Sequence, residues 1–216
     1  MKIRAEALLF DNDGTLVSSL ASVDRCWTQW AEEYGITAEE FGRVELHGRT
    51  AAEIAADLLP AEIVPAAVAR IEKLEVDDVP NGGVHLLPGT RGCLDSLPAD
   101  RWAVVTSATR RLAEARLDAV GILPKTLIAA NDVTRGKPDP EPYLLAARAL
   151  GVDPARCVVF EDAPAGLQAG RAAGMTTVAL ATTHQAHELL ADLVVTDLSA
   201  LSALVTGTGV EISVRG

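Results

Sequence analysis

Short apolar runs alternate with helix-like stretches along most of this 216-residue chain, and this alternation limits the possible folds more than any other feature. The apolar runs lie at residues 5–10, 102–106, 126–129, 157–160, 176–180 and 193–195. Apolar residues at helical spacing fill the stretches at 90–97, 109–120, 140–150 and 163–173. Strands that alternate with helices predict an α/β fold with a doubly wound parallel sheet, covered by helices on both faces.

Residues 17–87 interrupt this alternation. Three stretches with helical spacing, at 21–34, 50–59 and 63–75, follow one another without a strand between them. The segment VPNGGVHLLPG at 79–89 is rich in proline and glycine, which is typical of a boundary. We therefore predict an α-helical cap at 17–87, inserted into a Rossmann-like core that is formed by 1–16 and 88–216.

The composition limits the partners of the chain. A net charge of -11 and a pI near 4.8 argue against binding to nucleic acid or to an anionic membrane surface. Cys26, Cys93 and Cys157 are scattered without CxxC spacing, which indicates a reduced, cytosolic chain. No apolar run approaches membrane-spanning length, and the run at the N-terminus is too short for a signal peptide. We expect a cytoplasmic monomer that acts on a small molecule.

Polar residues that suit phosphate chemistry follow four of the predicted strands. They are Asp11, Asp13, Gly14 and Thr15; Thr106 and Ser107; Lys137; and Glu161 and Asp162. Ligands of an open parallel sheet bind at the carboxyl ends of its strands, so we expect these side chains to meet at one edge.

These residue types indicate phosphoryl transfer. Asp11 and Asp162 are the natural pair for Mg²⁺, which takes oxygen ligands, and an aspartate can itself be the nucleophile. Lys137 and Thr106 can hold the phosphate oxygens. Each feature alone also has a structural interpretation, since Asp-Gly is common in turns and Asp is a favoured helix cap. The presence of all four features, in order at strand ends, favours a site for phosphoryl transfer over these structural interpretations.

Four segments resemble the signature motifs of the haloacid dehalogenase-like (HAD) hydrolase superfamily. They are FDNDGTL at 10–16, VVTSAT at 104–109, GKPDPEPY at 136–143 and VVFEDAPAGLQAG at 158–170. The helical zone resembles the cap of one subgroup. Within it, LHGRT at 46–50 and the last two motifs are similar to 2-deoxyglucose-6-phosphate and glycerol-phosphate phosphatases.

The resemblance implies a role for each residue. Asp11 would attack phosphorus, and Asp13 would protonate the leaving alcohol and later deprotonate water. Thr106, Lys137 and the backbone amide of Ser107 would hold the phosphate. Mg²⁺ would be bound by Asp11, by the backbone carbonyl of Asp13 and by Asp162. Glu161 would act through metal-bound water or orient the site.

The cap offers two further candidates, His47 and Arg49. Arg49 either contacts the polar end of the substrate or satisfies a helix end, and both interpretations stay open. A cap over the site favours small substrates.

The resemblance therefore implies a Mg²⁺-dependent phosphatase that acts on small sugar or polyol phosphate monoesters through an aspartyl-phosphate. A sugar phosphomutase similar to β-phosphoglucomutase is an alternative. Such mutases carry a cap histidine beyond the nucleophile, where this chain has Val23, so a hydrolase is favoured. A catalytically idle binding module on the same fold is a further alternative.

Overall fold

The structure is a computed structural model, and it describes every residue except 1, 45, 47 and 216. In the described part, six strands form a sheet in the order β6-β5-β2-β7-β8-β9, with each neighbouring pair parallel. The strands are β2 (Ala7–Phe10), β5 (Trp102–Val105), β6 (Leu127–Ile128), β7 (Cys157–Glu161), β8 (Thr176–Leu180) and β9 (Leu193–Val195).

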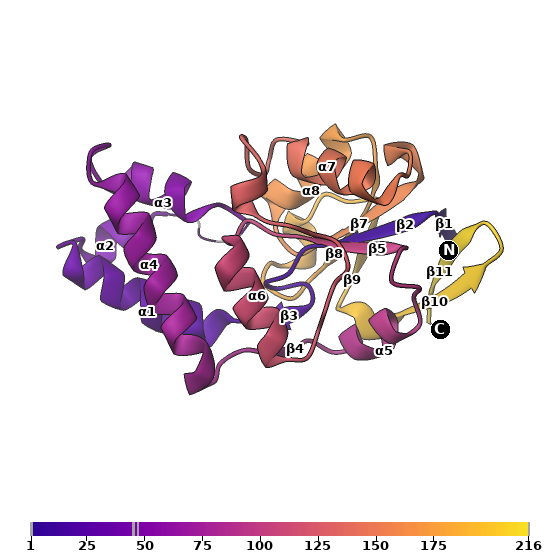
Figure 1. The fold of residues 1–216 in the computed structure, drawn as a ribbon, viewed down its shortest axis with the longest axis horizontal. Coiled ribbons are helices and arrows are strands. Elements are labelled where there is room, and N and C mark those ends of the chain that lie inside the picture. The colour runs from indigo at the N-terminus through magenta and orange to yellow at the C-terminus, as the bar shows by residue number, and fades with distance from the viewer. Residues whose placement is uncertain (1, 45, 47, 216) are drawn as a thin grey trace.

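Helices cover both faces of this sheet (Figure 1). They are α5 (Thr90–Asp95), α6 (Arg110–Ala119), α7 (Glu141–Leu150) and α8 (Pro164–Ala172). Side chains along β2 point alternately to the two faces of the sheet. Leu8 and Phe10 therefore pack in a core shared with α5 and α6, while Ala7 and Leu9 pack against α7 and α8. The ring of Phe10 stacks on that of Phe160 at a centroid distance of 4.7 Å. The predicted doubly wound α/β fold is confirmed.

A separate group of helices forms the cap, on the left in Figure 1. These helices are α1 (Leu20–Glu33), α2 (Ala38–Phe41), α3 (Ala51–Leu58) and α4 (Val64–Asp78). Trp27 and Trp30 are buried in a core of their own there, and the indole of Trp30 donates to the carbonyl of Ala67 at 2.9 Å. The sequence pattern missed α2, because this helix is short and contributes no fully buried residue.

The chain enters and leaves the cap side by side. Strands β3 (Val17–Ser18) and β4 (His85–Leu86) pair antiparallel at that point. Short 3-10 helices occupy several connections, at η1 (Val79–Asn81), η2 (Ala130–Asp132), η3 (Pro154–Arg156), η4 (Ala186–Glu188) and η5 (Leu198–Ala200). None of the helices in the described ranges is long and apolar enough to cross a membrane.

The two ends of the chain form a second sheet, which the sequence analysis missed. Strands β10 (Leu201–Thr206) and β11 (Gly209–Val214) make a hairpin, and β11 also pairs antiparallel with β1 (Lys2–Ala5). The strand predicted at 5–10 is β2 at Ala7–Phe10, while Ala5 ends β1 of the second sheet and Glu6 lies between the two strands. Val210 and Ile212 are buried against the main core, so this small sheet closes the end of the molecule opposite the cap (Figure 1).

Candidate active site

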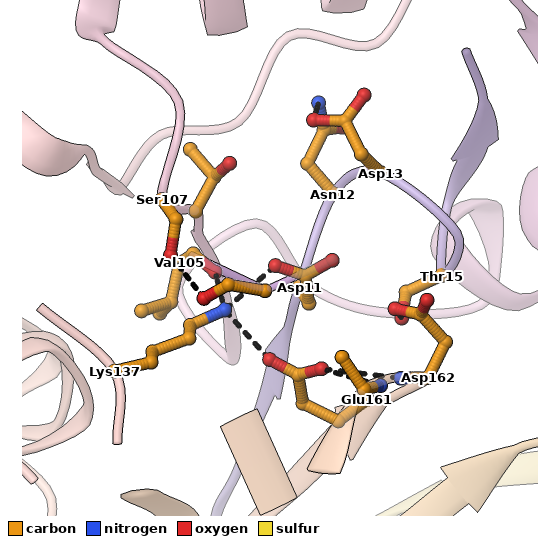
Figure 2. A network of polar contacts seen from close by, with 12 residues as sticks. Asp11, Asn12, Asp13, Thr15, Val105, Ser107, Lys137, Glu161 and Asp162 are labelled. Carbon is orange, nitrogen blue, oxygen red and sulfur yellow. Dashed lines mark hydrogen bonds and ion pairs between the residues drawn. The ribbon is translucent and has the colours of Figure 1, made fainter. Parts of the chain in front are cut away.

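The candidate site lies where the path of the chain reverses across the sheet. Strand β2 is followed by β5 and β6 on one side, and the chain then returns to β7 on the other side. Such a switch point opens a crevice at the carboxyl ends of the strands. Asp11 follows β2 there, Thr106 follows β5, and β7 ends at Glu161, which Asp162 follows. The structure thus brings together the residues that the sequence placed at separate strand ends (Figure 2).

Lys137 is the centre of the polar network. Its ammonium group donates to Asp11 Oδ1 at 2.6 Å, to Glu161 Oε1 at 2.6 Å and to the carbonyl of Val105 at 2.9 Å (Figure 2). The side chain is only 1% exposed, so Lys137 is not a surface lysine. A buried ammonium with two carboxylate partners is fixed in position and keeps its charge.

Glu161 has both oxygens engaged by protein donors. Oε1 accepts from Lys137 and from the Tyr143 hydroxyl at 2.8 Å, and Oε2 accepts the amides of Asp162 and Ala163 at 3.1 and 3.2 Å. Tyr143 was not among the predicted site residues, although it lies in the GKPDPEPY motif. A β-carbon at Gly166 would lie 1.7 Å from Oε1, so helix α8 can begin this close to Glu161 only with glycine there.

Asp162 is held by two threonines from other parts of the chain. Thr15 donates to Oδ1 at 3.2 Å, and the hydroxyl of Thr183 donates to Oδ2. Gly14 has a φ of +90°, and a β-carbon there would lie 2.2 Å from Asp162 Oδ2. Glycine is therefore required both by the turn and by the close approach of the carboxylate.

Burial makes this cluster electrostatically unfavourable without a further cation. Burial raises the pKa of Asp11 well above its ordinary value, with Lys137 opposing and Glu161 and Asp162 adding to the rise. Burial and then the charge of Glu161 raise the pKa of Asp162 to about 7. Burial alone would lower the pKa of Lys137, but Asp11 and Glu161 together outweigh it and raise that pKa. The carboxylates exceed the lysine in number, so bound positive charge would stabilise their ionised form.

The same cluster fits a hard divalent cation. Asp11, Glu161 and Asp162 each offer a carboxylate oxygen, and these three atoms lie within 4.8 Å of one another. Mg²⁺ prefers oxygen ligands and keeps several waters, so a few carboxylate or carbonyl oxygens suffice. Asp11 and Asp162 were the predicted carboxylate ligands, and both are in this group. Glu161 already accepts four protein hydrogen bonds, which favours the orienting role predicted for it.

The Asp13 carboxylate lies apart from the lysine network (Figure 2). Its Oδ1 accepts from the guanidinium of Arg116 at 2.9 Å and from Ser19 at 2.7 Å. The side-chain amide of Asn12 donates to Asp13 Oδ2 at 3.2 Å. Metal binding by the backbone carbonyl of Asp13 stays a prediction.

Thr106 and Ser107 follow β5 beside Asp11. The Thr106 hydroxyl accepts the amide of Ala108 at 3.1 Å, which fixes the turn. The Ser107 hydroxyl donates to the carbonyl of Gly48 in the cap at 2.9 Å. Ser107 was predicted to act through its backbone amide, and the structure adds a contact between core and cap through its side chain.

The cap candidates have different outcomes. His47 lies outside the described residues. Arg49 pairs with Asp57 at 2.8 Å and donates to the carbonyl of Glu53 at 3.4 Å, both on α3, as the structural interpretation expects. Arg49 also lines the cavity between cap and core, so it remains within reach of a bound molecule.

That cavity has a volume of about 280 Å³ and opens onto the candidate site. Asp11, Asp13, Thr106 and Ser107 line it from the core. The cap contributes polar groups such as Glu72 and Glu75, and apolar side chains that include Val23, Trp27, Ile54 and Val68. The volume suits a small molecule.

The fold and the site together define a capped α/β protein with buried carboxylates and a lysine at the candidate site. A family model described as haloacid dehalogenase-like hydrolase matches residues 5–174, and the chain belongs to this family. The resemblance expected from the four motifs is thus confirmed.

Curated relatives extend over most of the chain. Hexitol phosphatase A of Escherichia coli (strain K12) is 38% identical, covering 82% of this chain and 84% of the relative. Glycerol-1-phosphate phosphohydrolase 2 of Saccharomyces cerevisiae is 38% identical, covering 85% and 77%. 2-Deoxyglucose-6-phosphate phosphatase 1 of the same yeast is 34% identical, covering 93% and 91%.

Solved structures share the fold. A hydrolase from Pseudomonas syringae matches with a TM-score of 0.81 over 90% of this chain and 94% of that chain, at 22% sequence identity. This likeness supports the arrangement of core and cap.

Proposed function

We propose that the protein is a Mg²⁺-dependent phosphatase that hydrolyses small sugar or polyol phosphate monoesters through an aspartyl-phosphate. The observation that carries the proposal is the Lys137 ammonium, which is buried between Asp11 and Glu161 at 2.6 Å from each, beneath a cavity of small-molecule size. The curated relatives are named as phosphatases of hexitol, glycerol and deoxyglucose phosphates, and these names support the substrate class.

Asp11 is the proposed nucleophile. Lys137 holds Oδ1, which leaves Oδ2 to attack phosphorus. As the bond from Asp11 to phosphorus forms, the bond from phosphorus to the ester oxygen breaks, and Asp13 gives that oxygen a proton. Water then attacks the phosphorus of the aspartyl-phosphate while Asp13 takes a proton from this water. The bond from Asp11 Oδ2 to phosphorus breaks, which restores the Asp11 carboxylate and releases inorganic phosphate.

The remaining candidates bind the phosphate and the cation. Thr106, Lys137 and the Ser107 amide are proposed to hold the phosphate oxygens. Asp11, Asp162 and the backbone carbonyl of Asp13 would hold Mg²⁺, and Glu161 would orient Lys137. When bound, Mg²⁺ supplies positive charge that stabilises the phosphate oxygens in the transition state.

The organisation and setting of the protein are also proposed. We place the core at 1–16 and 88–216 and the cap at 17–87, and Arg49 is proposed to approach the leaving alcohol. The substrate is a small phosphorylated metabolite. A cytoplasmic location, a monomeric state and the absence of nucleic-acid or membrane binding stay predictions.

Phosphate release from a panel of esters tests the function. The panel holds glucose-6-phosphate, 2-deoxyglucose-6-phosphate, fructose phosphates, mannitol-1-phosphate, glycerol phosphates, phosphoglycolate and β-glucose-1-phosphate, each with Mg²⁺ and with EDTA. Release that needs metal and is fastest with a sugar or polyol ester supports the proposal. A product isomer from β-glucose-1-phosphate, without release from any ester, indicates a mutase instead.

Asp162→Ala is expected to weaken Mg²⁺ dependence. The variant removes one of the three clustered carboxylates, so the Mg²⁺ concentration for half-maximal activity should rise about 10-fold or more. Magnesium titration of the steady-state rate measures this shift. Asp118→Asn, at an exposed position on α6, is the control. An unchanged titration for Asp162→Ala would move the metal ligand elsewhere.

A further inference from the structure

A buried arginine joins the proposed acid/base to the cap. Arg116 on α6 is 3% exposed, and its Nη1 lies 2.9 Å from Asp13 Oδ1. Its Nη2 lies 2.8 Å from Oε1 of Glu75, which belongs to cap helix α4 and is 5% exposed. The same guanidinium therefore contacts Asp13 on the core side and Glu75 on the cap side.

The position of Arg116 in the helix makes this contact notable. Leu112, Ala113 and Leu117 are buried on the same face of α6, so an arginine stands where the helical pattern calls for an apolar residue. Removal of a guanidinium from water is unfavourable unless charged groups partner it. Asp13 and Glu75 provide these partners, and their geometry fixes the guanidinium between them.

The two carboxylate oxygens of Asp13 have different partners. Oδ1 forms an ion pair with Arg116 at 2.9 Å and accepts a hydrogen bond from Ser19 at 2.7 Å. Oδ2 accepts, among the described residues, the single longer bond from the Asn12 amide at 3.2 Å. The carboxylate is thus held by one oxygen, while the other is more available for proton transfer.

We propose that Arg116 is a positioning residue for the acid step. It holds Asp13 through Oδ1 so that Oδ2 carries the proton to the departing ester oxygen, and Glu75 holds the far side of the guanidinium. This inference rests on the proposed phosphatase function. It adds Arg116 to the residues already proposed as nucleophile, acid/base, phosphate ligands and metal ligands.

The leaving group provides a selective test. An alkoxide from a polyol phosphate needs a proton as it departs, whereas p-nitrophenolate is a good leaving group without one. The ratio kcat/KM reports the steps up to phosphoryl transfer and excludes the later hydrolysis of the aspartyl-phosphate. Comparing the two substrates therefore separates loss of acid catalysis from loss of fold or of phosphate binding.

Arg116→Met is expected to lower kcat/KM for the best polyol phosphate about 100-fold, at the lower end of what acid–base catalysis contributes. The value for p-nitrophenyl phosphate should fall much less. Arg116→Lys should recover part of the loss because it restores the positive charge. Arg111→Met, an exposed arginine on the same helix, is the matched control and should resemble wild type on both substrates.

A double-mutant cycle sharpens the test. If Arg116 acts through Asp13, Arg116→Met should cost almost nothing further on the polyol ester once Asp13→Asn is present. Glu75→Gln keeps the shape of the side chain and removes its charge. It should therefore lower kcat/KM for the polyol ester more than for p-nitrophenyl phosphate, but by a smaller factor than Arg116→Met does. This milder variant provides the test if Arg116→Met fails to fold.

Two results overturn the inference. Equal losses on both substrates would make Arg116 structural only, and full additivity with Asp13→Asn would remove the link to Asp13. Either result leaves the proposed function intact, because wild type would still hydrolyse the polyol ester. A wild-type protein without activity on any ester would refute the proposed function itself.

Discussion

Asp11→Asn is expected to abolish turnover of every ester, with a loss on the order of 10⁴-fold or more, as for removal of other nucleophiles. The amide has nearly the shape of the carboxylate, but its oxygen lacks the charge needed to attack phosphorus. The fold should survive, because Lys137 keeps Glu161 as a buried partner at 2.6 Å. The large cost of an unpaired buried charge therefore does not arise.

Phosphate release with Mg²⁺ in excess measures this loss, and thermal unfolding checks the fold of the variant. Asp95→Asn, an exposed position on α5, serves as a matched control with wild-type activity expected. Substantial residual turnover by Asp11→Asn would refute the nucleophile assignment. Incubation of wild type with substrate and acid quench should, in contrast, trap phosphate on the peptide that contains Asp11.

Asp13→Asn is expected to lower kcat for a polyol phosphate by a factor of about 10²–10⁴, the usual contribution of acid–base catalysis. The side-chain oxygen of asparagine can still accept from Arg116 and Ser19, so the contacts at Oδ1 are retained. The variant loses the proton that Asp13 donates and the base that it supplies to water. Aspartyl-phosphate should therefore accumulate when a good leaving group is used.

A burst of p-nitrophenol followed by slow steady turnover is the signature of that accumulation. Rapid mixing with p-nitrophenyl phosphate measures the burst, and a polyol ester under the same conditions should show slow formation of the intermediate as well. Near-normal rates on both substrates would rule out Asp13 as acid and base.

The sequence predicted the centre of the site because that centre depends on strand order. Asp11, Thr106 and Asp162 each follow a strand that the apolar runs marked. In a parallel sheet these ends meet at one edge, so residues far apart in the chain could be placed together. Lys137 was predicted at the same edge because it follows the short strand at 126–129, and only the structure shows how deeply it is buried.

The contacts around the centre could not be predicted, because they depend on how helices and loops pack. Thr183 reaches Asp162 from the loop after β8, and no pattern in the sequence marks it. Arg116 had a usable signal, since it shares the buried stripe of α6 with Leu112 and Leu117. Glu75 had a similar signal in the sequence, because it lies four residues beyond the buried Ile71 in α4.

The terminal hairpin was missed for a different reason. Its strands are half exposed, so apolar residues such as Val210 and Ile212 are too few to mark a core element. The pairing of β11 with β1 joins the two ends of the chain, and local sequence carries no information on such distant partners.

Strand β2 lies in the middle of the sheet, although it precedes the cap and both of its neighbours in the chain. Both of its neighbours, β5 and β7, come after the cap in the chain. On the ribosome, β2 therefore emerges without a strand partner, while the helices of the cap, which pack on one another, are completed first. The pairs that fix Asp11 require closure of long loops. A nascent chain that stops before β7 consequently lacks an assembled candidate active site, even when its cap is complete.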